Sequence, residues 1–241
     1  MNRLNHIWPD RAAARRTLTI AAILLLSAAL DAFAHGVAKG DKGYIQETFG
    51  IRMIPFMYLG AKHMVTGYDH LLFLFGVIFY LYRLKDIGVY VTLFAVGHST
   101  TLLFGVLTGV SVSSYIIDAI IGFSVVYKAL DNMGAFRIWF GYQPNTKAVT
   151  MIFGLFHGFG LATKLLDFDM DKEGLVPNLL SFNIGVEIGQ LLALSAILIA
   201  MSYWRRTPGF NRYGYTANAI VMTAGFVLVG YQLAGYLITT S

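Results

Sequence analysis

Long apolar stretches recur along the chain, and each is close to the length that crosses a membrane as a helix. About 20 apolar residues span the hydrocarbon core, so the pattern predicts six transmembrane helices in one domain. The predicted helices lie at 64–84, 87–107, 112–133, 148–166, 175–203 and 215–238. The apolar stretch 51–60 is too short to span and contains Pro55, so it predicts an interfacial or re-entrant piece.

The N-terminal residues have the pattern of a signal peptide. A basic stretch ending at Arg16 precedes an apolar run, 18–30, and a small-x-small motif that ends at Ala34. We expect cleavage after Ala34, which would leave His35 as a mature N-terminal residue able to bind metal through its amine and imidazole. The alternative is an uncleaved first helix. The expected division is a signal peptide, an outer N-terminal and interfacial segment and a six-helix transmembrane domain, at 1–34, 35–62 and 63–241.

The composition agrees with an all-α, polytopic transmembrane bundle. Hydrophobic residues make up 56% of the 241 residues and charged residues only 13%, against about 25% charged in soluble domains. The chain has no cysteine, which excludes disulfides, thiolate nucleophiles and cysteine-ligated metals. The net charge is +5, but the basic residues are dispersed between apolar segments instead of forming a patch, so we expect no nucleic-acid binding.

Loop charges orient the predicted bundle. Lysine and arginine gather on alternate loops, which is typical of cytoplasmic loops. These basic residues are Arg83, Lys85, Arg137, Lys147, Arg205, Arg206 and Arg212. The intervening loops are uncharged at 108–111 and acidic at 167–173. The sequence therefore predicts a multi-pass protein of the bacterial inner membrane with its mature N-terminus outside.

Histidine and aspartate cluster at the start of the first predicted helix. An ionisable side chain costs about 2.5–3.5 kcal/mol at the centre of a spanning helix, so few are kept without a role. His63 and His70 are seven residues apart, two helical turns, and Asp69 adjoins His70. We expect all three on one face at the outer end, as ligands for Ni²⁺, Co²⁺ or Zn²⁺. An alternative for Asp69 is to accept a ring N–H and fix a histidine tautomer.

Further polar residues lie deeper in the predicted bundle. His98, His157 and Glu187 fall near the middles of the second, fourth and fifth helices, and we expect them to form a midplane metal site or relay. We count four supporting polar positions: Ser99, Asp118, Asn183 and Gln190. The simpler alternative for the histidines, Asn183 and Gln190 is hydrogen bonding between helices. For Asp118, which we expect near the outer surface, it is a helix-terminal or structural role. Two small-xxx-small glycine pairs predict close helix packing: Gly154 with Gly158, and Gly185 with Gly189.

These motifs resemble the HupE/UreJ family of membrane proteins, in its broader branch. The similar blocks are 60–73, which contains H-x5-D-H, and 97–102, 153–162 and 182–190. The resemblance implies a nickel or cobalt permease linked to hydrogenase or urease maturation. One position departs from the pattern: Met64 follows His63, where hydrogenase-linked members usually have proline.

Two classes of function fit these residues. The first is a divalent metal permease or facilitator that captures Ni²⁺ or Co²⁺ at His63, Asp69 and His70 and passes it to the deeper ligands. The alternative is an intramembrane zinc-dependent hydrolase with Glu187 or Asp69 as the base. Ligands spread from the surface to the midplane of the membrane favour a transport path, whereas ligands at one level favour a catalytic centre. We expect the ligands to be spread. The expected partners are membrane lipid and the metal ion, with a homo-oligomer or metalloenzyme-maturation proteins left open.

Overall fold

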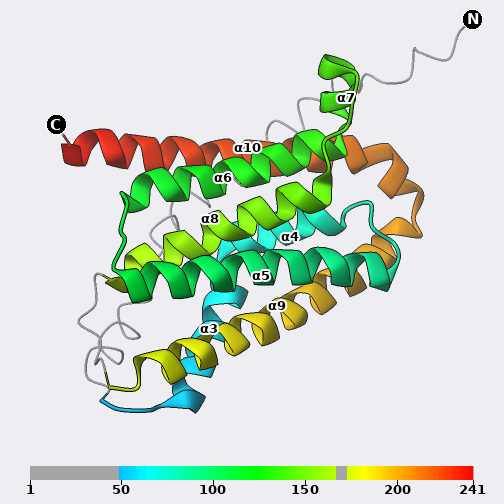
Figure 1. Ribbon diagram of the computed structural model, residues 1–241. Coiled ribbons are helices and arrows are strands. Elements are labelled where there is room, and N and C mark those ends of the chain that lie inside the picture. The colour runs from blue at the N-terminus through cyan, green and yellow to red at the C-terminus, as the bar shows by residue number, and fades with distance from the viewer. Residues whose placement is uncertain (1–48, 167–172, 241) are drawn as a thin grey trace, which may run out of the picture. The chain divides into compact units, whose positions relative to one another are not determined.

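The computed structural model describes residues 49–166 and 173–240 (Figure 1). The expected signal peptide with its cleavage position, His35 and most of the acidic loop lie outside the described residues. The described part of the chain is helical and contains no strand, which confirms the predicted all-α class.

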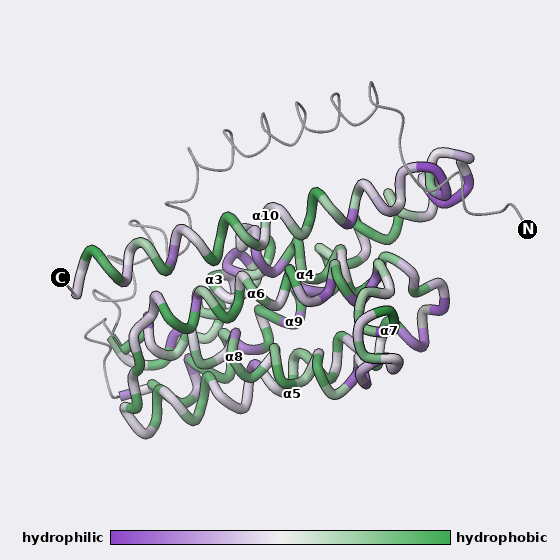
Figure 2. Tube along the Cα trace, turned by 90° about the horizontal axis from the view of Figure 1, so that it is seen from above, coloured by the Kyte–Doolittle hydropathy of each residue, from purple (hydrophilic) through white to green (hydrophobic). Residues whose placement is uncertain are grey.

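Eight helices make up the described residues. Their bounds are α3 (Met53–Thr66), α4 (Tyr68–Ile78), α5 (Leu84–Thr108), α6 (Ser114–Asn132), α7 (Ala135–Phe140), α8 (Thr146–Leu166), α9 (Leu175–Arg205) and α10 (Pro208–Thr240). Four of them, α5, α8, α9 and α10, are by length and composition each able to cross a membrane alone. Hydrophilic residues gather at the end of the bundle where α7 lies (Figure 2), which is the end that carries the basic loops.

The sequence pattern placed two neighbouring elements wrongly: the first predicted helix and the short apolar stretch before it. Instead of one helix over 64–84, the chain forms α3 and α4 with a break at Gly67. The stretch 51–60 is not a separate interfacial piece, because most of it belongs to α3. Gly67 has extended backbone (φ −74°, ψ 107°). Its N–H donates to the carbonyl of His63 at 3.0 Å, and its own carbonyl accepts from Leu71 N–H at 3.1 Å. Gly67 therefore ends one helix and begins the next.

Together, α3 and α4 run the length of α9. At the start of α3, the backbone N–H of Arg52 donates to Oδ1 of Asn178 at 2.7 Å. At the end of α4, the guanidinium of Arg205 donates to the carbonyl of Phe79 at 2.9 Å. Asn178 and Arg205 lie near opposite ends of α9. The break at Gly67 is therefore near the middle of the bundle, so the prediction that His63, Asp69 and His70 lie at the outer end was wrong.

Glycines allow helices to pack backbone against backbone in three pairs: α3 with α9, α5 with α8, and α6 with α10. A Cβ built on Gly185 would lie 1.9 Å from the carbonyl oxygen of Met57. One on Gly158 would lie 2.0 Å from the carbonyl oxygen of His98. Such distances leave no room for a side chain, and they confirm the predicted role of the glycine pairs in α8 and α9.

Two apolar clusters surround the middle of the bundle. One includes Met64, Leu102 and Phe182. The other is more aromatic and includes Phe73 and Phe94. Both clusters are built from residues that the helices turn away from lipid, so polar side chains that lie between them are shielded from lipid and from water alike.

Candidate metal centre

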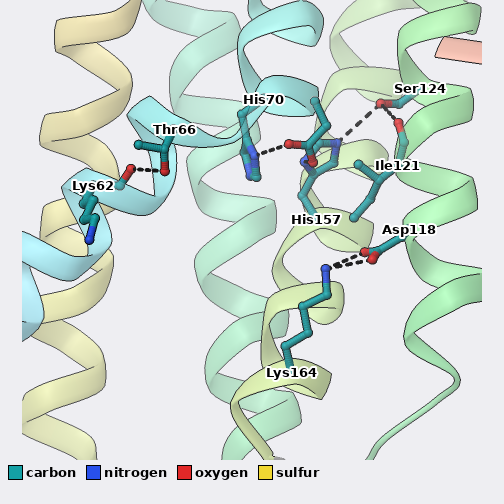
Figure 3. A network of polar contacts seen from close by, with 9 residues as sticks. Lys62, Thr66, His70, Asp118, Ile121, Ser124, His157 and Lys164 are labelled. Carbon is teal, nitrogen blue, oxygen red and sulfur yellow. Dashed lines mark hydrogen bonds and ion pairs between the residues drawn. The ribbon is translucent and has the colours of Figure 1, made fainter. Parts of the chain in front are cut away.

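The break between α3 and α4 places two ionisable side chains at the start of α4. Asp69 and His70 are in its first turn, and each is almost fully buried. Oδ1 of Asp69 lies 2.9 Å from Nδ1 of His70 (Figure 3). A carboxylate in the first turn is favoured by the positive end of the helix dipole and by backbone N–H groups that have no helical acceptor. The broken helix thus creates a position where a buried acid is tolerated.

His157, from α8, completes a group of three possible metal ligands. Its Nδ1 lies 3.9 Å from Oδ2 of Asp69. One ligand atom from each of Asp69, His70 and His157 lies within 4.8 Å of the other two, and all three residues are buried. Metal bonds of about 2.0–2.2 Å separate two ligand atoms by at most about 4.4 Å. Small side-chain rotations would therefore close this group around one ion.

Ser124, from α6, lies beside this group. Its Oγ is 3.4 Å from Nε2 of His157 and donates to the carbonyl of Ile121 at 2.6 Å (Figure 3). Nε2 of His157 thus faces Ser124, and Nδ1 faces Asp69. Sequence reasoning missed Ser124. The sequence did contain a signal for it: one polar face of α6, formed at spacings of four and three residues by Ser124, Lys128 and Asp131. All three residues are buried.

Two further histidines adjoin the group from other helices. The ring centroids of His63 (α3) and His70 are 5.1 Å apart, and those of His98 (α5) and His70 are 6.4 Å apart. Within the described residues, neither ring nitrogen of the buried His98 has a hydrogen-bond partner, and neither does Nε2 of His70. Buried polar atoms are nearly always satisfied, so these nitrogens indicate a site that a ligand completes.

The geometry corrects two predictions about these histidines. His63 and His70 do not share a helix face, because Gly67 interrupts the helix between them; they are close because α3 and α4 meet there. The expected spread of ligands over depth is also absent, since His63, His70, His98 and His157 surround one point. The residue types correctly indicated which side chains gather, whereas the spacing expected for an unbroken helix did not predict how they meet.

The three polar residues predicted along α9 separate. Asn183 and Gln190 are buried, and their side-chain amides have no hydrogen-bond partner among the described residues. Glu187 is exposed on the outer surface of α9 and lies outside the group of three possible ligands. Glu187 is four residues after Asn183 and three before Gln190, so it lies roughly 40–60° around the helix from each of them. This rotation is enough to place Glu187 beyond the edge of the buried face.

Asp118 and Ser99 lie apart from the three-ligand group. Asp118 on α6 is buried and accepts from Nζ of Lys164 on α8 at 2.9 Å (Figure 3). Lys164 is seven residues after His157 on α8, which places this ion pair about 10 Å along the helix from His157. Ser99 is half-buried on α5. Asp118 therefore has a partner of its own that accounts for its burial.

Helices and site together define a class: a helical membrane protein with a buried histidine–aspartate cluster of the kind that binds transition metals. Comparison with protein families then identifies the family within this class. The profile of the family described as HupE / UreJ protein matches residues 39–240, so the chain belongs to the HupE/UreJ family. Neither the search of curated proteins nor that of solved structures gave a match.

Proposed function

We propose that this protein is a permease that carries Ni²⁺ or Co²⁺ across the inner membrane, with Asp69, His70 and His157 binding the ion midway. The observation that carries the proposal is the buried three-ligand group at the break between α3 and α4. Membership of the HupE/UreJ family, which relates to nickel and cobalt handling, supports it. Imidazole and carboxylate ligands also suit these ions.

Electrostatics favour a cation at this position. The Asp69 side chain is only about 1% exposed, and an ionised carboxylate in such surroundings requires a compensating positive charge. A divalent cation provides that charge and satisfies the nitrogens of His70 and His98. Binding requires neutral imidazoles, so it would release any protons that these rings carry.

Although the possible ligands lie at one depth, the broken helix beside them supports a transport role. Membrane transporters commonly bind substrate near the bilayer midplane at discontinuous helices, and the protein opens to either side of that fixed site. Gly67 provides the discontinuity here, and α3 and α4 are separate units that could move independently. We place His63 and His98 as additional ligands that contact the ion as it enters or leaves the three-ligand group.

A second candidate, an intramembrane zinc-dependent hydrolase, is favoured by one observation. The possible ligands gather at one level, and three of them would leave a coordination position open for water. If three of the neighbouring histidines held the zinc instead, Asp69 would be free to act as the base. The two functions differ in whether the metal crosses the membrane or stays bound.

Uptake by purified protein in liposomes separates the two candidates. Radioactive Ni²⁺ or Co²⁺ should accumulate inside, and His157→Gln should lower the initial rate at least tenfold. The control is Phe226→Leu on the exposed surface of α10, which should leave the rate unchanged. Absence of uptake, with tightly bound zinc and cleavage of a lipid ester or amide, would instead support the hydrolase.

A further inference from the structure

Glu187 is an acidic residue on the outside of a membrane-spanning helix. It lies three residues from the midpoint of α9, the most hydropathic of the four candidate spans. Its side chain is exposed, and around it the surface is apolar, with Ile184, Ile188 and Leu191 all exposed. None of the described residues forms an ion pair or hydrogen bond with it. An acidic side chain facing lipid at this depth is unfavourable, and such residues nearly always find a polar partner.

We infer that the outer face of α9 is an interface between two copies of this chain, paired through Glu187. Two copies in one membrane share the same orientation, so a two-fold axis between them runs along the membrane normal. An interface on that axis brings each residue to its equivalent at the same depth. Glu187 would therefore meet Glu187 of the second copy, and two carboxyl groups that share a proton form a hydrogen-bonded pair.

The surroundings of Glu187 suit a second copy better than lipid. α9 lies at one edge of the bundle (Figure 1) and packs mainly against α3, so the face opposite α3 is accessible to another chain. Ser195 is exposed one helical turn beyond Leu191, and a small residue there allows a second helix to approach closely. A different protein would need a polar group at a matching depth, whereas a second copy has one there necessarily.

Disulfide formation tests the interface directly, because the chain has no native cysteine. Ile184→Cys and Leu191→Cys flank Glu187 on its own face and leave it intact. Each should give a covalent dimer on mild oxidation in native membranes. Phe226→Cys is the matched control: it is similarly exposed and near the middle of α10, and it should stay monomeric. Equal dimer yields at Leu191 and Phe226, or none at Ile184 and Leu191, would overturn the inference.

The role of the carboxyl group is tested separately by energy transfer between labelled copies in liposomes. Glu187→Gln keeps a hydrogen-bonding group and should keep most of the dimer. Glu187→Leu should weaken dimerisation by roughly three- to thirtyfold, the range expected for a hydrogen bond between membrane helices. Equal association of these two variants would contradict pairing through Glu187. The measurements are made with a chelator present, so their outcome is independent of metal transport.

Discussion

At the scale of single residues, the candidate site depends on what surrounds each buried acid. Asp118 and Asp69 are both buried, but their neighbours differ. Asp118 is neutralised by the ammonium group of Lys164 at 2.8 Å. Asp69 instead contacts the imidazoles of His70 and His157, which are themselves able to bind a metal ion. Asp69 therefore belongs to a group of possible metal ligands, whereas Asp118 belongs to an ion pair.

This difference gives a matched pair of substitutions. Asp69→Asn keeps the shape of the side chain but removes the charge that attracts a cation, so we expect Ni²⁺ or Co²⁺ affinity to fall at least tenfold. Asp118→Asn removes a buried acid outside the three-ligand group and should change the affinity by less than about twofold, although it leaves Lys164 without its partner and should lower stability. Titration calorimetry of the purified proteins measures the affinities. Equal losses in both variants would argue against Asp69 as a ligand.

At the scale of helices, the break at Gly67 and the glycine contacts between helices set the geometry of the site. A side chain at position 67 would meet the His70 ring, with Nδ1 only 2.6 Å from its Cβ. The contact of Gly158 with the carbonyl of His98 holds α5 against α8, and so keeps His98 close to His157. The histidines thus meet because small residues let the helix backbones come together.

The α3–α9 contact is open to a direct test of stability. Gly185→Ala should destabilise the protein by about 1–3 kcal/mol, because the added Cβ would overlap the backbone carbonyl of Met57, which cannot rotate away. Gly230→Ala is the control: this glycine is also helical, but nothing lies within 4 Å of the position that its Cβ would take. Reversible unfolding in mixed micelles compares the two variants. A Gly185→Ala protein of unchanged stability would mean that α3 and α9 pack less closely than these distances indicate.

At the scale of the whole molecule, the orientation in the membrane follows from the loops. Helices α5 and α6 are joined by an uncharged loop, whereas α7 and its neighbours carry Arg137 and Lys147 at the opposite end of the bundle. Exposed aromatic side chains, Trp139, Phe140 and Tyr142, lie at that same end, where a membrane–water interface favours them. We expect this end to face the cytoplasm.

Labelling from outside the cell tests the orientation. Ser111→Cys in the loop between α5 and α6 should react with an impermeant thiol reagent in intact cells, because we expect that loop outside. Tyr142→Cys should react only after the membrane is opened. Both positions are exposed, so accessibility within the protein does not distinguish them. The opposite labelling would show that the end with Arg137 and Lys147 faces outward and would overturn this orientation.

The sequence by itself determined the membrane class and the five helices after the first, because both follow from the hydropathy along the chain. It also determined which histidines gather in the bundle, because a polar side chain inside a spanning helix is costly and therefore stands out in the sequence. Only the tertiary structure decided how those residues meet. Periodicity assumes an unbroken helix, so it could not anticipate that Gly67 adopts extended backbone and brings His63 to His70 from a separate helix. Nor could it separate Glu187 from Asn183 and Gln190, since the edge of a buried face is set by the neighbouring helices.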